Sequence, residues 1–147
     1  MFVLDAHVIS ELIRAEPDPV VAAWVASQAP TSLFLTAVNE AELRFGVAIM
    51  PAGARRDAIE AAIDDILRRH FADRILVLGS RAAAAYAALA ARQRAAGRSV
   101  QQLDIQIAAI AVTHNMALAT RNVADFAGLD LELIDPWAVP ERRAAGR

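Results

Sequence analysis

The chain of 147 residues contains neither cysteine nor lysine, and each absence excludes particular chemistries. Without cysteine there is no disulfide framework, no thiolate nucleophile and no zinc site built on thiolates. Without lysine there is no Walker phosphate loop and no Schiff-base enzyme, because the first requires a lysine side chain and the second an amine. All 15 basic residues are therefore arginine, and oxygen atoms are the main metal donors available.

Long apolar runs and an excess of positive charge are also missing. The sequence has no uninterrupted run of about 20 apolar residues, which is the length that spans a bilayer. Residues 1–5 lack the basic flank of a signal peptide. The net charge of −2 gives no overall positive field to attract nucleic acid. We therefore expect a cytoplasmic protein that does not contact membranes.

The composition is that of one globular domain rich in helix. Hydrophobic residues make up 56% of the chain and charged residues 22%, which excludes intrinsic disorder. Alanine, the residue most favourable to helices, occurs 35 times. Strands are predicted at residues 2–4, 33–35, 75–78, 117–119 and 131–134, and helices at 7–14, 19–25, 38–49, 55–70, 80–96 and 100–114. This alternation predicts an α/β fold with a parallel sheet covered on both faces.

Three helix starts are predicted from capping residues. Asp18 is the predicted cap of the helix that begins at Pro19. Ser80 is the predicted cap of the alanine-rich helix, and Ser99 with Gln102 fits a capping box for the helix that follows.

Acidic and polar residues follow three of the predicted strands, where ligands of open parallel sheets bind. Asp5 ends the first strand, and Thr36 leads from the second strand into a helix that contains Glu40 and Glu42. The fourth strand is followed by Thr120, Arg121, Asn122 and Asp125. These positions are the candidates for a functional site.

Glu40 and Glu42 are distinguished by helical phase, because residues two apart lie on different faces of a helix. Glu42 shares the predicted apolar stripe of Val38, Phe45 and Ile49, whereas Glu40 faces solvent. A carboxylate on a buried stripe is costly unless it is paired or binds a metal. We therefore expect Glu42 to contribute to a site and Glu40 to be an ordinary solvated acid.

Asp104 presents a similar anomaly, because its helical neighbours Val100, Ile107, Ala108 and Ala111 are all apolar. Each acid also has an ordinary explanation: Asp5 fits a helix cap, Asp104 a cap of a helix that begins later, and Asp125 a turn residue. If the acids converge, two carboxylates 4 Å apart repel by roughly 4 kcal/mol at an effective dielectric near 20. Either a divalent cation is then present or some of the acids are protonated. Mg²⁺ or Mn²⁺ suits an all-oxygen site that activates water for phosphodiester hydrolysis.

Five segments, in order over residues 1–137, resemble the motifs of PIN domains, in particular those of VapC/FitB-like toxins of bacterial toxin–antitoxin pairs. They are FVLDAHVISE at 2–11, AELRFG at 41–46, LDIQIAAIA at 103–111, LATRNVADF at 118–126 and LIDPW at 133–137. The first differs from the usual motif at Ala6 and His7, where threonine and asparagine are common. The resemblance implies a PIN domain at residues 1–137, and residues 138–147 are predicted to be a mobile tail.

The resemblance also implies a fold and an activity. The fold is a three-layer sandwich in which a parallel sheet of about five strands is flanked by helices. The activity is that of a Mg²⁺- or Mn²⁺-dependent endoribonuclease. Carried over by position, the acids of the site are Asp5, Glu42, Asp104 and Asp125, of which Asp5, Asp104 and Asp125 would bind the metal. Thr120 and Asn122 match the polar pair that lines the site, and Arg121 is the best candidate for an RNA phosphate contact because its loop holds the acids.

The partners implied by the resemblance are an antitoxin and a second copy of the chain. The antitoxin inserts a C-terminal segment into the cleft and has a DNA-binding N-terminus, so the toxin reaches operator DNA only through it. Trp24, the alanine-rich helix and the stripe of Ile59, Ile63 and Ile66 are the apolar surfaces predicted to form these interfaces.

Two other functions are compatible with parts of the pattern. One is a non-catalytic PIN-like partner in a DNA-binding repressor complex with its antitoxin, which Ala6 and the acidic net charge leave open. The other is a phosphatase of the haloacid-dehalogenase type, but His7 occupies the place of its second aspartate and its lysine is absent.

Overall fold

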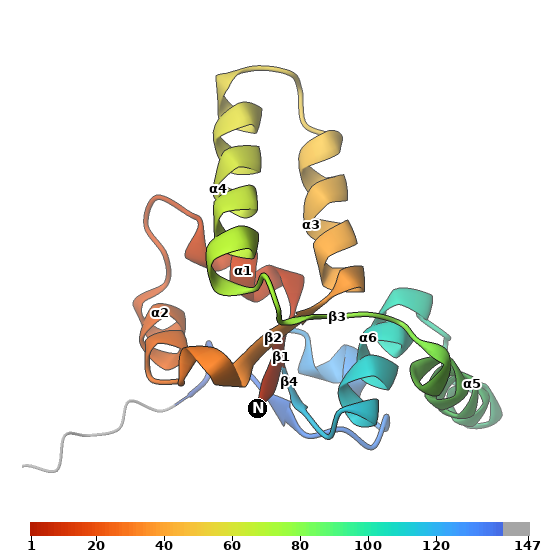
Figure 1. Cartoon of the computed structure of the whole chain (residues 1–147). Helices are drawn as coiled ribbons and strands as arrows, with labels where there is room; N and C mark the ends of the chain where they lie inside the picture. The colour runs from red at the N-terminus through yellow and green to blue at the C-terminus, as the bar shows by residue number, and fades with distance from the viewer. Residues whose placement is uncertain (140–147) are drawn as a thin grey trace, which may run out of the picture.

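A parallel sheet of five short strands lies at the centre of the computed structural model, which describes residues 1–139 (Figure 1). The strand order is β3-β2-β1-β4-β5. The strands are β1 (Phe2–Leu4), β2 (Leu33–Thr36), β3 (Ile75–Leu76), β4 (Ala117–Ala119) and β5 (Leu133–Ile134). The helices are α1 (Ala6–Leu12), α2 (Pro19–Ala26), α3 (Ala37–Ala48), α4 (Ala54–His70), α5 (Ser80–Ala95) and α6 (Gln102–Thr113), with 3₁₀ turns η1 (Pro30–Ser32) and η2 (Val123–Phe126).

Helices cover both faces of the sheet, which confirms the predicted α/β sandwich of about five parallel strands. Alternate residues of a strand point to opposite faces. Leu4 therefore packs into the core made with α1, α2, α3 and α4, while Val3 packs into the core made with α5 and α6. Both side chains are fully buried. The short strands are continuous apolar runs in the sequence because helices cover both faces of the sheet.

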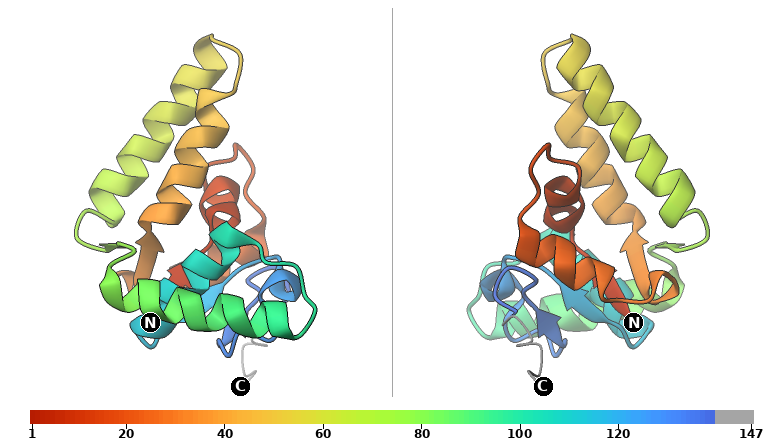
Figure 2. Two further views of the ribbon diagram at one scale, coloured as in Figure 1. Left: turned by 90° about the vertical axis from the view of Figure 1, so that its right-hand side faces the viewer. Right: turned by 90° about the vertical axis from the view of Figure 1, so that its left-hand side faces the viewer.

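α3 and α4 form a hairpin that stands away from the sheet (Figures 1 and 2). Leu43 and Val47 of α3 pack with Ile63 and Leu67 of α4 in the same core cluster as α1. The predicted stripe of α4 is confirmed at Ile63, which is buried. The core that α3 and α4 share with α1 therefore continues beyond the edge of the sheet.

The predicted apolar stripe of α3 is wrong. The buried residues of this helix are Asn39, Leu43 and Val47, whereas Phe45 and Ile49 are 66% and 67% exposed. The cause lies at the start of the helix, where Thr36 and Asn39 form a capping box that turns Asn39 inward. The helix is thus rotated from the phase that hydrophobicity alone indicates.

The predicted capping roles of Ser80 and Ser99 are also wrong, whereas that of Asp18 is confirmed. α5 is capped by the backbone of Gly79, and Ser80 makes no capping hydrogen bond. α6 begins only at Gln102, and its N-cap Gln101 makes no side-chain hydrogen bond to the helix. Ser99 instead accepts a hydrogen bond from the side chain of Gln101 at 3.4 Å. Asp104 consequently lies in the first turn of α6, where an acid is favoured by the helix dipole.

Two of the side chains predicted for interfaces, Trp24 and Ile63, are covered within the chain, whereas much of the alanine-rich helix α5 is exposed. Trp24 is 8% exposed and stacks edge-on against Phe2, with ring centroids 5.3 Å apart. Ile63 is 3% exposed. The large apolar side chains that remain exposed are Met1, Phe45, Ile49, Val77, Leu78, Val100 and Leu103.

Of the predicted tail, residues 140–147 lie outside the described residues. Among residues 1–139 no helix is both long and apolar enough to cross a membrane.

Candidate active site

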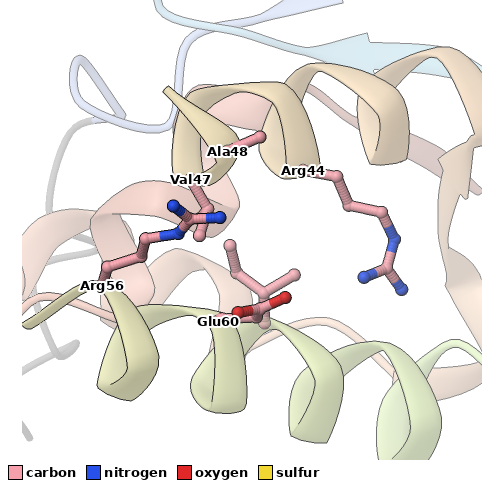
Figure 3. Close-up of a pocket in the computed structure, with 6 residues that line it drawn as sticks. Arg44, Val47, Ala48, Arg56 and Glu60 are labelled. Carbon is pink, nitrogen blue, oxygen red and sulfur yellow. The ribbon is translucent and has the colours of Figure 1, made fainter. Parts of the chain in front are cut away.

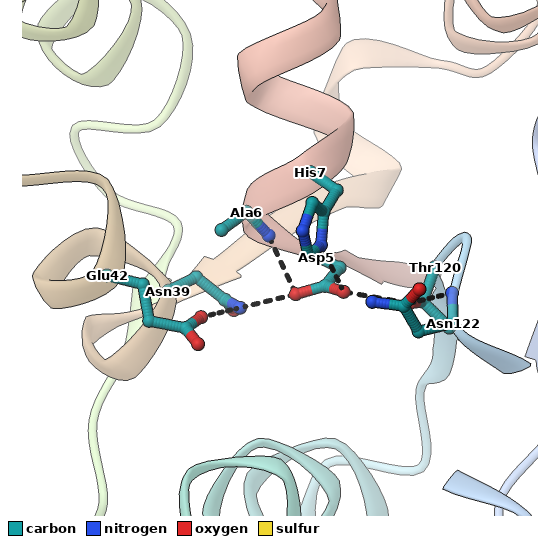
Figure 4. Close-up of polar contacts among 7 residues, drawn as sticks. All are labelled: Asp5, Ala6, His7, Asn39, Glu42, Thr120 and Asn122. Atoms are coloured by element: carbon teal, nitrogen blue, oxygen red, sulfur yellow. Dashed lines mark hydrogen bonds and ion pairs between the residues drawn. The ribbon is translucent and has the colours of Figure 1, made fainter. Parts of the chain in front are cut away.

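Asp5 lies at the centre of the candidate site, directly after β1 and between the ends of β2 and β4 (Figure 4). Its side chain is buried, and three donors fix it. The Ala6 amide donates to Oδ1 at 2.8 Å, so Asp5 also caps α1. The Thr120 hydroxyl donates to Oδ2 at 2.8 Å. The third donor is the amide of Asn39 at 3.3 Å from Oδ1. The carboxylate is therefore held in one orientation.

Asn39 connects the end of β2 to two of the acids. It is fully buried, and its Oδ1 accepts a 2.7 Å hydrogen bond from the Thr36 hydroxyl. Its Nδ2 donates to Asp5 and, at 3.5 Å, to Oε2 of Glu42 (Figure 4). Neither Asn39 nor this relay is predicted by the sequence analysis. The available signal is the Thr-x-x-Asn spacing after a strand, three residues before Glu42.

Glu42 and Glu40 have different surroundings, as predicted, although the phase argument for Glu42 is wrong. Glu42 is half-buried beside Asn39, and burial together with the charges of Asp5 and Asp104 raises its pKa. Glu40 instead accepts a hydrogen bond from Arg44 at 3.0 Å, and Arg44 also pairs with Asp64 at 2.9 Å. Glu42 is thus the member of the pair that faces the other acids.

Asp104 and Asp125 approach the same site from the other side of the sheet. Asp104 comes from the first turn of α6 and Asp125 from η2, after β4. Burial raises the pKa of Asp104, and the charges of Asp125 and Asp5 add to this effect. Asn39 links Asp5 to Glu42, and Asp104 and Asp125 line one pocket, so acids from separate segments of the chain lie at this edge of the sheet.

The remaining predicted residues lie on the loop after β4. Thr120 is fully buried against Asp5, and its hydroxyl accepts a hydrogen bond from the backbone of Asn122 at 3.1 Å. Arg121 is exposed, and its guanidinium lies 5.2 Å from the centre of the Trp137 ring. His7, beside Asp5, places Nδ1 at 3.5 Å from Oδ2.

Glu11, the last residue of the first motif, lies outside this set of acids. It is 7% exposed and accepts a hydrogen bond from the Asp18 backbone amide at 2.8 Å. This hydrogen bond, with the nearby Arg14, lowers the pKa of Glu11. Glu11 therefore fastens the loop between α1 and α2 and does not contribute to the cluster.

The chemistry of the acids fits a hard divalent cation. All donors are carboxylate oxygens, and the pKa values of Glu42 and Asp104 are raised first by burial and then by the charges of neighbouring carboxylates, which a cation would offset. Among residues 1–139, no three acidic or imidazole side chains are grouped tightly enough to hold one ion as they lie. The acids therefore fit a divalent cation by the type of their donor atoms and by their charge.

Two pockets adjoin acids of the site, and a third lies between α3 and α4. A groove of about 690 Å³ runs from His7 and Glu42 along α1, α3 and α4 to Met50 and Arg55. A second hollow, of about 500 Å³, adjoins Asp104 and Asp125. A smaller one of about 220 Å³ lies between α3 and α4, where Figure 3 shows Arg44, Val47, Ala48, Arg56 and Glu60 around it. Only the first two include acids of the site.

Comparison with known proteins agrees with this geometry. The family model described as PIN domain matches residues 2–130. The chain belongs to the PIN domain family. This confirms the resemblance to PIN domains drawn from the sequence.

The chain is similar to several named PIN-domain proteins over most of its length. It is 42% identical to the VapC ribonuclease Y4jK of Sinorhizobium fredii over 137 residues, which cover 93% of this chain and 98% of that protein. It is 34% identical to the toxin FitB of Neisseria gonorrhoeae, with 93% and 99% covered. The crystal structure of FitAcB from Neisseria gonorrhoeae aligns with a TM-score of 0.88 and 33% identity, covering 95% of this chain and 100% of that one. The resemblance to VapC and FitB is thereby confirmed.

Proposed function

We propose that this PIN domain is the toxin of a toxin–antitoxin pair and acts as a Mg²⁺- or Mn²⁺-dependent endoribonuclease. The observation that carries the proposal is the convergence of acids from separate segments upon the buried, three-donor Asp5. The similarity to a VapC ribonuclease supports the same activity.

Each side chain has a distinct role in this proposal. Asp5, Asp104 and Asp125 bind the cation, which when bound supplies the charge that activates water and offsets the developing charge on the phosphate. Glu42 completes the acidic set at the α3 side, where its raised pKa suits it to accept a proton from the attacking water or, once protonated, to donate one to the leaving oxygen. Thr120 and Asn39 orient the Asp5 carboxylate, and Asn122 orients Thr120. Arg121 contacts an RNA phosphate at the rim.

Cleavage by the purified chain tests the enzyme. We expect hydrolysis of total RNA in Mg²⁺ or Mn²⁺, and its loss in Asp5→Asn and in Asp104→Asn with the fold retained. Adding the cation to the wild-type chain should raise its Tm, since a ligand that binds the native state stabilises it, and Asp5→Asn should lose most of this increase. Full cleavage by both variants, or no cation-dependent cleavage by the wild type, contradicts the proposal and leaves the non-catalytic partner as the better account.

The partner in this proposal is an antitoxin of the VapB/FitA type with a DNA-binding N-terminus, through which the pair binds operator DNA. The structure of FitAB bound to a DNA fragment, 32% identical to this chain with a TM-score of 0.88, supports this assembly. The groove along α1, α3 and α4 is apolar along Leu43, Val47 and Ile59 and ends at the acids. It suits a helical segment that places an arginine against the carboxylates, because a guanidinium can replace the charge of the metal.

Co-purification tests the partner. The product of the adjacent upstream reading frame should co-purify with the chain and suppress its cleavage of RNA. A harmless chain that binds no small partner would end the toxin assignment even if the nuclease site is active.

A further inference from the structure

The hollow of about 500 Å³ beside Asp104 and Asp125 has acids on one side and an arginine on the other. Its walls come from the end of α5, the loop between α5 and α6, the start of α6 and η2. The residues that line it are Gln93, Arg98, Ser99, Gln101, Asp104, Ala124, Asp125 and Ala127. Its volume falls within the range of about 300–1,000 Å³ typical of small-molecule pockets, so it can admit one nucleotide.

Arg98 is held in place at the wall of this hollow. Its Nη1 donates a 2.9 Å hydrogen bond to the carbonyl of Ala127, next to η2. Gly97, with φ of +70°, turns the chain after α5. Gly128 leaves room for the guanidinium, since a Cβ at that position would overlap with it. The arginine is thus fastened to the loop that contains Asp125.

The charge of Arg98 is available for a ligand. Among the described residues 1–139, no carboxylate lies within ion-pair distance of Arg98, whereas Arg14, Arg44, Arg68, Arg69 and Arg92 all have acidic partners. One hydrogen bond to Ala127 leaves most of its five N–H donors for an anion. A phosphate is the anion that a guanidinium binds best, because two donors can bind two oxygens.

Polar groups beside Arg98 can bind a base. Gln101 and Ser99 are exposed, and the contact between them, from Gln101 Nε2 to Ser99 Oγ, is long at 3.4 Å. Gln93 is 6% exposed and uses its Nε2 to donate to Ala127 at 3.4 Å. Amide side chains of this kind hydrogen-bond to the edges of unpaired bases.

We propose that this hollow is a nucleotide subsite, in which Arg98 binds the RNA phosphate adjacent to the scissile one and Ser99 and Gln101 contact its base. The inference rests on the proposed ribonuclease function. The acids at one end accept a phosphate only with a cation, while Arg98 at the other end accepts one by itself. RNA presents one phosphate per nucleotide, so a strand that reaches the acids from this side brings its next phosphate to Arg98.

The test separates the charge of Arg98 from its contact with Ala127. Arg98→Gln removes the charge but can still donate to the Ala127 carbonyl, and Arg98→Ala removes both. Arg94→Gln is the matched control, because Arg94 is exposed in the last turn of α5 and does not line the hollow. Binding is measured in the Asp5→Asn background by fluorescence anisotropy in Mg²⁺, with a fluorescein-labelled pool of single-stranded RNA of random sequence. Cleavage of the same pool by chains with Asp5 intact gives KM and kcat.

We expect Arg98→Gln and Arg98→Ala to bind the RNA about tenfold more weakly, with the salt slope of binding reduced by about 0.7, as for one lost phosphate contact on a single strand. KM should rise about tenfold while kcat changes less than about twofold, because the contact lies outside the reacting atoms. Arg94→Gln should match the wild type.

Two outcomes overturn the inference, and they are distinguishable. If the wild type cleaves RNA and Arg98→Gln binds and cleaves like it, Arg98 is only a structural contact to Ala127 and the subsite is wrong. If the wild-type chain neither binds nor cleaves RNA, the proposed function fails and the subsite fails with it.

Discussion

Glu42 shows how a residue can be predicted correctly for the wrong reason. The apolar periodicity of the sequence predicts that Glu42 lies on a buried stripe with Phe45 and Ile49, but both of these apolar side chains are exposed. Glu42 faces the acids because it follows Asn39 by one helical turn, and Asn39 is drawn inward by Thr36 and Asp5. A hydrogen-bonded polar residue, invisible to a hydrophobic pattern, therefore sets the orientation of the helix.

The two glutamates of α3 give the first prediction. Glu42→Gln should reduce RNA cleavage by at least about a hundredfold, because it removes a charge or proton carrier from the site. Glu40→Gln should leave cleavage within about twofold, because an exposed ion pair such as that with Arg44 contributes only about 0–1 kcal/mol. Both rates are measured on the same RNA, with circular dichroism to confirm the fold. The opposite ranking would show that Glu40 is the functional acid.

The second prediction concerns the stability of the protein without metal. Burial and the charges of Asp125 and Asp5 raise the pKa of Asp104, so the folded chain binds a proton there more tightly than the unfolded chain does. The destabilisation is present at neutral pH and disappears as the pH falls through the raised pKa. Asp104→Asn should therefore raise the Tm at pH 7.5 by up to about 4 °C, or about 1 kcal/mol, a limit set by solvent screening of a half-buried group.

The pH dependence provides the control for this prediction. The Tm of the metal-free wild type should rise as the pH is lowered from 7.5 through the raised pKa values of Glu42 and Asp104, because protonation removes their buried charges. Asp104→Asn should show a smaller rise over the same range. Calorimetry in EDTA measures both proteins, and equal slopes would mean that Asp104 is not repelled by its neighbours.

At the scale of elements, the strands and helices were predictable and their exact starts were not. Asp18 and Pro19 mark the start of α2 as expected, because the Asp18 carboxylate accepts from the Val20 amide at 2.8 Å. Ser80 and Ser99 have the right residue type but cap nothing. A residue type that favours capping does not by itself form a cap, because the tertiary contacts of the loop decide whether its side chain accepts a hydrogen bond from the helix.

The loops after β4 and β5 meet where Arg121 lies over Trp137, and this contact gives the third prediction. The guanidinium is 5.2 Å from the ring centre, so the ring restricts where the Arg121 charge can lie. If Arg121 binds an RNA phosphate, Trp137→Leu should raise KM about threefold with little change in kcat, since exposed cation–π contacts contribute about 0.5–1 kcal/mol. Trp137→Phe, which keeps an aromatic face, should be milder. Steady-state cleavage assays distinguish them, and an effect on kcat alone would argue against a positioning role.

At the scale of the whole molecule, the order of the strands is what assembles the site. β1 pairs with β2 on one side and with β4 on the other, so Asp5 stands between Thr36 and Thr120. The apolar runs of the sequence predict acids at the ends of strands, but they do not indicate which strands are neighbours in the sheet. The central position of β1 is therefore known from the structure alone.

The predicted homodimer gives the last prediction. Trp24 and Ile63, which were expected to contribute to it, are buried within the chain, and the large apolar side chains exposed on α3 are Phe45 and Ile49, one turn apart. If these side chains are buried between two copies, each contributes about 1.5–3 kcal/mol, so replacing both with serine should raise the dimer dissociation constant at least about a hundredfold. Ala61→Ser, on the exposed face of α4, is the control. In analytical ultracentrifugation the wild type and the control should sediment as dimers at micromolar concentration, and the double variant as a monomer with an unchanged circular dichroism spectrum. A dimer that survives the double substitution must use another surface, and a monomeric wild type would refute the homodimer.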